Sequence, residues 1–538
     1  MKIASSAFIR CKLAIIAQTA QELTQKHHVD PIPSAHPDDP LNWPLAAKIT
    51  TYGTICLFSF MANVNGSNFT VAVVPLQREF HVTLTRAVFL IAFNVLMFGL
   101  GNILWVPMMR VLGKRPVYLL ALAVLIAANV WSTRAQSWGS LLGGRMLAGF
   151  GASAADATVP SAVADMFFID QRGHCMMFFH FALASGIFLG PLINAYIVQY
   201  HGWRWSTEFI AIAGGVIFML ACFLIRETQY DRSASGRPSN EQSPKRSYAG
   251  WLSLTVGFNN DKPLQRFART LWDILRMAFY PPVLWVGCLI GLFVGWTIII
   301  QTTVANTFLK PPYSWKLGSI GLFSLSGWIG SLLAFYFGGK LTDLIANRAR
   351  LHDHTVKPRP GKRLIALIVP TVLAPVGLII FGQCVAGRTH WIGPAFGYAM
   401  HSFGFTAVSN IAVTFAVDCY QDFAGEALVT VFVIRNIIAV VCSFYSPQWI
   451  AQNGMEKVCG WSKSRLSVRW LTVIGHRHHG RLGMGPSRTG GPYVVLHQQH
   501  SVIYEDIRSP KALAHGGRDG LSGLLSAEVL HSYDTTIS

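Results

Sequence analysis

Charged side chains are scarce in this chain: only 13% of its 538 residues are Asp, Glu, Lys or Arg, whereas 52% are hydrophobic. Soluble domains usually carry about 25% charged residues, so the composition argues against a soluble protein and for a membrane protein. Paired cysteine motifs are lacking as well, because the nine cysteines are scattered, odd in number and form no C-x-x-C pair. We interpret them as small apolar packing residues.

Motifs of enzymatic and ATP-driven chemistry are also missing. The chain has no Asp-rich motif and no H-E-x-x-H, which argues against an integral-membrane enzyme. It has no G-x-x-x-x-G-K-[ST] loop, which argues against ATP-driven transport. The first 48 residues contain only short apolar stretches, too little for the core of a signal peptide, so we expect the first true span to serve as the insertion signal. We expect no cofactor and no metal.

Long apolar runs, in contrast, are abundant. A helix that crosses about 30 Å of hydrocarbon needs about 20 mostly apolar residues. Eleven stretches qualify, six before and five after a polar gap at 226–281, and they predict an all-α polytopic membrane protein. The expected spans are 50–75, 87–108, 116–132, 138–163, 175–199, 207–225, 282–308, 317–338, 364–386, 391–417 and 427–446.

Basic residues are distributed unevenly between alternate loops. If the N-terminus lies inside, the inner segments carry 25 Lys and Arg and the outer loops carry 7. Because cytoplasmic loops of membrane proteins collect Lys and Arg, this bias predicts a cytoplasmic N-terminus and a cytoplasmic central loop. Topology then explains most of the net charge of +19, and we expect no nucleic-acid partner.

The second group of spans repeats a feature of the first. Gly113-Lys114-Arg115 follows span 2, and Gly361-Lys362-Arg363 follows span 8. Two halves with matching basic turns are typical of a transporter that is built from structural repeats and binds its substrate between them. The expected segments are an N-terminal segment (1–48), a six-helix half (49–225), a central loop (226–281), a second half with five visible helices (282–446) and a polar tail (447–538).

Charged residues deep inside an expected span cost about 2.5–3.5 kcal/mol each and are functional candidates by default. Span 4 contains Arg145 and Asp156, and span 11 contains Arg435. Arg145 and Asp156 are three helical turns apart, so they would line one stripe of a polar cavity about 16 Å long. Asp156 is the better candidate for a proton carrier, because a buried carboxyl is costly to keep charged. The alternative is that Asp156 is a fixed partner of a polar group on another helix.

Uncharged polar residues indicate which other spans face a cavity. Span 1 is polar and interrupted by a glycine, although its amides could also bond to a neighbouring helix. A histidine in span 10 can change its charge near neutral pH, but a single histidine is more often structural. The candidates for the substrate and proton pathway in these spans are Asn63, Asn65 and Asn68 in span 1, Trp296, Gln301 and Asn306 in span 7, and His401 and Asn410 in span 10.

Several short motifs together resemble those of a known family, the major facilitator superfamily, and within it the fungal-type drug:proton antiporter-like branch. The resemblance extends roughly over residues 39–449. It rests on Asp39-Pro40-Leu41-Asn42-Trp43-Pro44, Gly113-Lys114-Arg115-Pro116-Val117, Arg145-x-x-x-Gly149-x-Gly151, Gly186-x-x-x-Gly190-Pro191, Trp203-Arg204-Trp205, Asp418-x-Tyr420 and Arg435-Asn436.

This resemblance implies the major facilitator fold of two six-helix pseudo-repeats, with substrate bound between spans 1, 4, 7 and 10. It also implies gating motifs, in which the basic turn pairs with helix-end carboxylates and glycines allow close helix contact. The gating residues carried over are Gly113, Lys114, Arg115 and Asp165, then Gly186, Gly190 and Pro191, and in the second half Gly339 and Asp343.

The sequence departs from the family pattern at two places. Arg110 stands where the family's common span 2–3 motif has an Asp, which leaves the gate pairing of the first half in question. Asn194-Ala195 replaces the usual glycine pair after Gly190-Pro191, which weakens the inference of export.

The C-terminal tail does not fit the family either, because twelve spans are expected and only eleven are visible. From residue 456 onward no apolar run exceeds about five residues. We interpret this change as an unspliced intron or a frameshift that begins near Lys457 and removes the twelfth helix. A disordered tail on a genuine eleven-span protein is the alternative.

These features together predict a monomeric, multi-pass secondary transporter that works by alternating access within the lipid bilayer. We expect it in the plasma membrane, with a vacuolar or other organelle membrane as the alternative. We expect it to export a small organic compound, such as a drug or secondary metabolite, and to couple transport to protons through Asp156. The alternative is uptake of an organic cation such as a polyamine, with Asp156 and Glu208 as counter-charges. A transporter-like sensor that binds without transporting is a further alternative.

Overall fold

The computed structural model describes residues 39–229, 263–311, 313–352, 360–420 and 423–461. Most of the N-terminal segment, most of the central loop and nearly all of the tail therefore lie outside the described residues. All regular structure in the described part is helical, as expected for an all-α protein. The elements are η1 (Pro40–Asn42), α2 (Leu45–Ser67), η2 (Asn68–Thr70), α3 (Val73–Phe80), α4 (Leu84–Leu112), α5 (Lys114–Arg134), α6 (Trp138–Met166), α7 (Ile169–His201), α8 (Trp203–Leu224), α10 (Pro263–Met277), α11 (Pro281–Phe308), α12 (Leu317–His352), η4 (Pro360–Leu367), α13 (Ile368–Ala386), α14 (Ile392–Cys419) and α15 (Ala424–Trp461).

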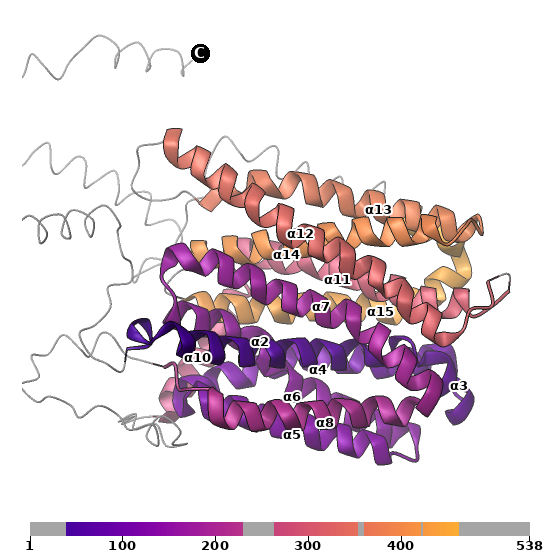
Figure 1. Ribbon diagram of the computed structural model, residues 1–538, viewed down its shortest axis with the longest axis horizontal. Helices are drawn as coiled ribbons and strands as arrows, with labels where there is room; N and C mark the ends of the chain where they lie inside the picture. The colour runs from indigo at the N-terminus through magenta and orange to yellow at the C-terminus, as the bar shows by residue number, and fades with distance from the viewer. Residues whose placement is uncertain (1–38, 230–262, 312, 353–359, 421–422, 462–538) are drawn as a thin grey trace, which may run out of the picture. The chain divides into compact units, whose positions relative to one another are not determined.

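Ten helices in the described part are long and apolar enough to cross a membrane. The expected fourth span corresponds to α6, which has 29 residues but is not one of these ten, because Gly, Ala and polar residues make up much of it. α6 nevertheless lies inside the bundle, packed against α2, α4 and α5. The helices of the bundle run side by side along one direction, as Figure 1 shows.

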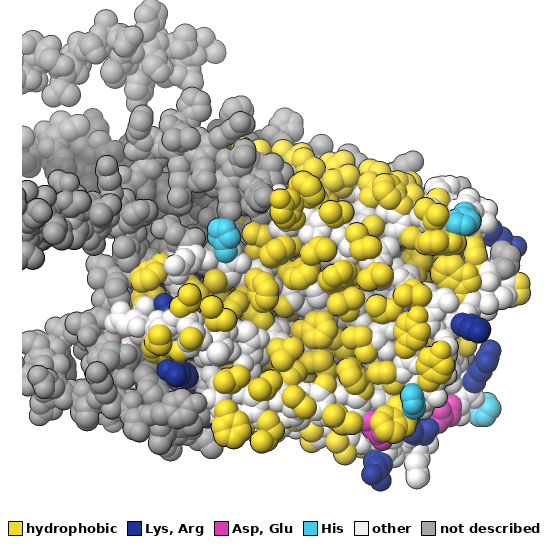
Figure 2. Space-filling view, in the orientation of Figure 1, with side chains coloured by type: hydrophobic (Ala, Val, Ile, Leu, Met, Phe, Trp, Pro, Cys, Tyr) yellow, Lys and Arg dark blue, Asp and Glu magenta, His cyan; other side chains and the backbone are white. Residues whose placement is uncertain are grey.

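The surface of this bundle matches a membrane environment. Figure 2 shows apolar side chains over the middle of the visible face, with basic and acidic side chains gathered toward the two ends. Such a belt can face lipid, whereas the charged ends can reach water. The chain thus has the surface of an integral membrane protein.

Each half of the bundle has its own contacts. In the first half α6 packs on α4 and α5, α7 on α2, and α8 on α5; in the second half α14 packs on α12 and α13, and α15 on α11. The halves meet along two seams, α4 against α15 and α7 against α12. We call the end of the bundle where α8 leads toward α10 the loop end, and the opposite end the far end.

Two helix boundaries differ from those expected. The first span ends as an α-helix at Ser67, and η2 continues it to Thr70, whose hydroxyl donates to the carbonyl of Ser67. α15 continues past residue 446 to Trp461, with a break at Gly454, where φ is +73°. The part of the tail that begins at residue 447 is therefore helical as far as 461, and the rest lies outside the described residues.

Candidate functional site

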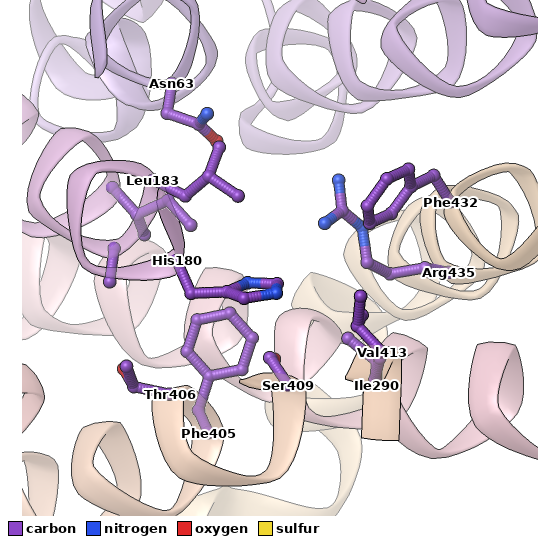
Figure 3. Close-up of a pocket in the computed structure, with 12 residues that line it drawn as sticks. Asn63, His180, Leu183, Ile290, Phe405, Thr406, Ser409, Val413, Phe432 and Arg435 are labelled. Carbon is purple, nitrogen blue, oxygen red and sulfur yellow. The ribbon is translucent and has the colours of Figure 1, made fainter. Parts of the chain in front are cut away.

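A small cavity lies between the two halves, midway along the helices. The first half contributes α2 and α7 to its wall, and the second half contributes α11, α14 and α15. Its volume of about 20 Å³ has room for roughly one water molecule. The lining residues are Asn63, His180, Leu183, Ala184, Ile187, Ile290, Phe405, Thr406, Ser409, Val413, Phe432 and Arg435 (Figure 3).

An ion pair joins the halves beside this cavity. Arg435 of α15 donates from Nη2 to Oδ2 of Asp156 on α6 across 2.5 Å. The Asp156 side chain has no exposed surface, and 12% of the Arg435 side chain is exposed. The guanidinium also lies over the ring of Phe432, 4.7 Å from its centroid. The two ionisable residues expected in spans 4 and 11 are thus direct partners.

Polar groups of both halves face the cavity around this pair. Figure 3 shows His180 and Asn63 on one side and Arg435 on the other, with Ser409 between them along the wall. Asn63 donates to the carbonyl of Ser59 in its own helix. His180 is buried, and its Nε2 has no hydrogen-bond partner. The cavity therefore offers hydrogen-bonding groups that the protein itself leaves unused.

Arg145 does not line this cavity, although the helical spacing placed it on the same stripe as Asp156. It is fully buried and donates to the side-chain and backbone oxygens of Asn65, at 2.9 and 2.6 Å. Its guanidinium lies 4.6 Å from the ring centroid of Phe69. All three residues belong to the first half, so Arg145 and Asn65 bind α6 to α2 within that half.

Asn68 and Gln301 contact other helices away from the main cavity. Asn68 contacts the hydroxyl of Ser206 on α8, near the far end. Gln301 donates to the carbonyl of Ile187 and to the hydroxyl of Tyr398, and it lines a second cavity of about 10 Å³. This second cavity lies nearer the far end, where Pro191 also contributes to its wall.

The remaining candidates of the second half lie outside both cavities. His401 is buried against Thr297, with 3.2 Å between Nε2 and the threonine hydroxyl. Trp296 packs against Trp449 of α15, with 6.1 Å between the ring centroids. The last two, Asn306 on α11 and Asn410 on α14, are half-buried.

The α4–α15 seam is closed along its whole length. At the loop end Arg110 donates to Glu426 at 2.6 Å, which joins the two halves. Arg110 stands where the family's motif has an Asp, so in this pair the first half supplies the positive charge and the second half the negative charge. In the middle Gly99 lies so close to Asn436 that a Cβ there would be 2.8 Å from the asparagine Cβ. The far part of the seam is closed by Phe89 and Phe444, which stack at 4.6 Å.

The α7–α12 seam is closed in the same way. At the far end the amide of Gly318 donates to the side chain of Gln199 at 2.6 Å. Trp328 donates to the hydroxyl of Ser185 at 3.1 Å near the middle. Toward the loop end the rings of Phe181 and Phe335 lie 5.0 Å apart. Both seams are thus closed along their described side chains, and with a cavity of about 20 Å³ the structure is an occluded state without room for an organic substrate.

The described contacts of the basic turn between α4 and α5 join it to α6, to the end of α8 and to the start of the central loop. Gly113 adopts a φ of +98°, and Lys114 pairs with Asp165 at the end of α6. The backbone amides of Lys114 and Arg115 donate to the two carboxylate oxygens of Glu227, at 3.1 and 3.0 Å. This carboxylate caps the positive end of α5, an arrangement that stabilises a helix N-terminus.

The gating glycines of α7 lie against α2. A Cβ on Gly186 would be 2.4 Å from the carbonyl oxygen of Phe60, and one on Gly190 would be 2.2 Å from the hydroxyl of Ser67. Gly339 and Asp343 belong to the part of α12 whose side chains lie outside the described residues.

Tyr420 packs against Tyr280 at the loop end, where burial raises the pKa of its phenol to about 12.

Three polar residues of the cavity wall were not among the sequence candidates: His180, Thr406 and Ser409. A signal exists for His180, because His180, Leu183, Ala184 and Ile187 follow the i, i+3, i+4, i+7 spacing of one helical face. That spacing does not say which face of α7 points to the other half. In the part of the chain that the structure describes, no three His, Cys, Asp or Glu residues are grouped as metal ligands.

Comparison with known proteins gives a consistent result. The model of the family described as Major Facilitator Superfamily matches residues 54–443. The MFS-type transporter penM of Penicillium rubens is 26% identical over 441 residues, which cover 80% of this chain and 83% of that protein. The efflux pump vrtL of Penicillium aethiopicum is 25% identical over 461 residues, which cover 81% of this chain and 85% of that protein.

Solved structures show the same fold. The proton:xylose symporter XylE, bound to 6-bromo-6-deoxy-D-glucose, superposes with a TM-score of 0.60, covering 81% of this chain and 96% of XylE at 13% sequence identity. At this identity the likeness concerns the fold alone.

Proposed function

Because this chain belongs to the major facilitator superfamily, we propose that it is a proton-coupled secondary transporter that exports a small organic compound by alternating access. The family and the apolar helices make it a multi-pass membrane transporter. Export is supported by the similarity to a relative named as an efflux pump. The proposed setting is the plasma membrane, with the N-terminus and the loop end in the cytosol and the protein as a monomer.

The observation that carries proton coupling is the ion pair between Asp156 and Arg435. One partner belongs to each half, so the halves cannot separate at this depth without breaking the pair. Leaving one charge of a buried pair without its partner costs about 3–5 kcal/mol. A proton on Asp156 removes the negative charge and lets the halves part, while water or substrate in the opened cavity solvates Arg435. Each transport cycle would then carry a proton on Asp156.

The cavity wall supports an amphipathic organic substrate. Aliphatic and aromatic side chains such as Ile290, Phe405 and Phe432 make up most of the lining. A few polar groups interrupt it, among them His180 and Ser409. Sites of this kind bind small molecules mainly through apolar contact and orient them through a few hydrogen bonds. Neither Asp156 nor Glu208 lines these two cavities, and Arg435 does, so the wall itself offers no carboxylate to an organic cation.

The test is transport by purified protein in proteoliposomes with an imposed pH gradient. Candidate probes are the lipophilic dye rhodamine 6G for export of organic compounds and radiolabelled spermidine for the cation alternative. Asp156→Asn should abolish gradient-driven accumulation of the transported probe. Asp273→Asn, which changes a carboxylate of α10 outside the cavity wall, is the matched control and should transport normally. Unchanged accumulation by Asp156→Asn would remove Asp156 from the mechanism.

A further inference from the structure

α10 is a short helix at the loop end that is divided into three faces. Its buried face consists of Thr270, Ile274 and Met277, which lie against α4 and α15. The carbonyl of Ile274 accepts a hydrogen bond of 3.0 Å from the hydroxyl of Thr430 on α15. These contacts fix how the helix is rotated about its axis, and therefore which side chains point away from the bundle.

The second face is apolar and uncovered. Leu264, Trp272 and Leu275 project within one arc, because successive residues of an α-helix are 100° apart. They are 79%, 66% and 47% exposed, and Phe279, just after the helix, is 86% exposed. Large apolar side chains grouped on one side of a helix indicate a membrane or protein contact.

The third face is basic. Arg266, Arg269 and Arg276 are exposed on the arc beyond the apolar one, and Asp273 is the only acidic residue of this helix. A helix with an apolar arc beside a basic arc is suited to the boundary between headgroups and acyl chains, where the apolar side enters the lipid and the arginines meet anionic headgroups. An apolar protein partner would not account for the three arginines.

We propose that α10 lies in the interface of an anionic lipid leaflet, with Leu264, Trp272 and Leu275 in the acyl-chain region and the three arginines among the headgroups. The occupant of the apolar face is therefore lipid, as proposed for the surface of the apolar spans. Because the buried face holds Thr430, this attachment anchors the loop ends of α4 and α15 at the same depth.

The experiment is photocrosslinking of the full-length protein in nanodiscs of phosphatidylcholine, with or without phosphatidylserine. Leu275 is replaced by p-benzoylphenylalanine, and adducts are identified by mass spectrometry. The matched control carries the same group in place of Arg266, an exposed residue on the basic face. We expect acyl-chain adducts at position 275 and few at position 266. The readout is an adduct and not a flux, so it is independent of the proposed transport activity.

A second measurement tests the charge. In the mixed nanodiscs, phosphatidylserine should be over-represented among the adducts relative to its share of the lipid. Arg276→Gln should lower this enrichment by up to about fivefold, the factor that one arginine contributes at an anionic surface. Adducts to another segment of this chain, or to a second copy, would overturn the proposal. Lipid adducts without any preference for phosphatidylserine would overturn its electrostatic part.

Discussion

At the scale of single residues, two arginines inside the bundle differ in whether their partner lies in the same half or in the other half. Arg145 bonds to Asn65 within the first half, so a movement of one half against the other leaves this contact intact. Arg435 bonds to Asp156 across the halves, so the same movement must break it. We therefore expect Arg145 to stabilise the fold, and we propose that Arg435 takes part in the transport cycle.

The first prediction concerns the stabilising arginine. Asn65→Ala removes both the side-chain acceptor of Arg145 and the fit of the buried guanidinium. Hydrogen bonds to charged groups contribute about 1.5–3 kcal/mol, so the free energy of unfolding should fall by that amount. Thermal unfolding in detergent measures the change. Asn306→Ala, at a half-buried site outside both cavities, is the control and should unfold close to the parent. Equal shifts in the two variants would contradict the role assigned to Arg145.

Sequence reasoning could identify the residues of the ion pair but not the pairing itself. Asp156 and Arg435 stand out because ionisable groups are costly inside a membrane. The two residues are 279 positions apart in the sequence, and only the packing of α6 against α15 brings them together. Arg145 and Asp156 have different surroundings because different helices cover α6 along its length: α2 at Arg145 and α15 at Asp156.

At the scale of helices, glycines set how closely neighbours approach. A Cβ on Gly149 of α6 would be 2.2 Å from the carbonyl oxygen of Asn94 on α4. By contrast, a Cβ on Gly215 of α8 would have no neighbour within 4 Å. The same substitution should therefore have opposite consequences at these two helical positions.

The second prediction follows from this contrast. Gly149→Ala should lower the free energy of unfolding by about 1–3 kcal/mol, the usual effect of overpacking. Gly215→Ala should be neutral or slightly stabilising, because alanine is the better helix former. Thermal unfolding of both variants in one detergent provides the comparison. A stable Gly149→Ala protein would show that α4 and α6 are not packed as described.

The third prediction concerns the gate pair at the loop end. Glu426→Gln removes the partner of Arg110 and should favour opening of the α4–α15 seam, by about fivefold if the pair contributes about 1 kcal/mol. The labelling rate of Thr430→Cys with a membrane-impermeant maleimide reports this opening. Exchanging the charges (Arg110→Glu with Glu426→Arg) should restore slow labelling only in part, because a cation at the start of α15 opposes the helix dipole. A labelling rate that is unchanged by Glu426→Gln would exclude this pair as a gate.

For the whole molecule, the closure of both seams defines the state that the structure represents. The ten apolar helices of the described part were predictable from the length and hydropathy of the runs, whereas α6 does not reach that hydropathy. The seams were not predictable, because they depend on contacts such as Arg110 with Glu426 and Gln199 with Gly318, which join distant parts of the chain. The tail beyond residue 461 lies outside the described residues, so its interpretation remains a prediction.

The fourth prediction concerns orientation. The described native cysteines are buried or half-buried, so an exposed cysteine introduced at one end reports which side of the membrane that end faces. Lys310→Cys, at the far end, should react with an impermeant maleimide in intact cells. Arg276→Cys, at the loop end, should react only after permeabilisation. The reverse pattern would contradict the cytoplasmic placement of the loop end that the distribution of Lys and Arg predicts.

The most direct test of the account separates proton coupling from substrate movement. The double variant Asp156→Asn with Arg435→Gln keeps the seam free of an unpaired charge, so the fold and the alternating movement should survive. In proteoliposomes it should still exchange the transported probe down a concentration gradient, but it should no longer accumulate that probe against one when a pH gradient is imposed. Accumulation at the parental level would contradict the claim that Asp156 carries the proton.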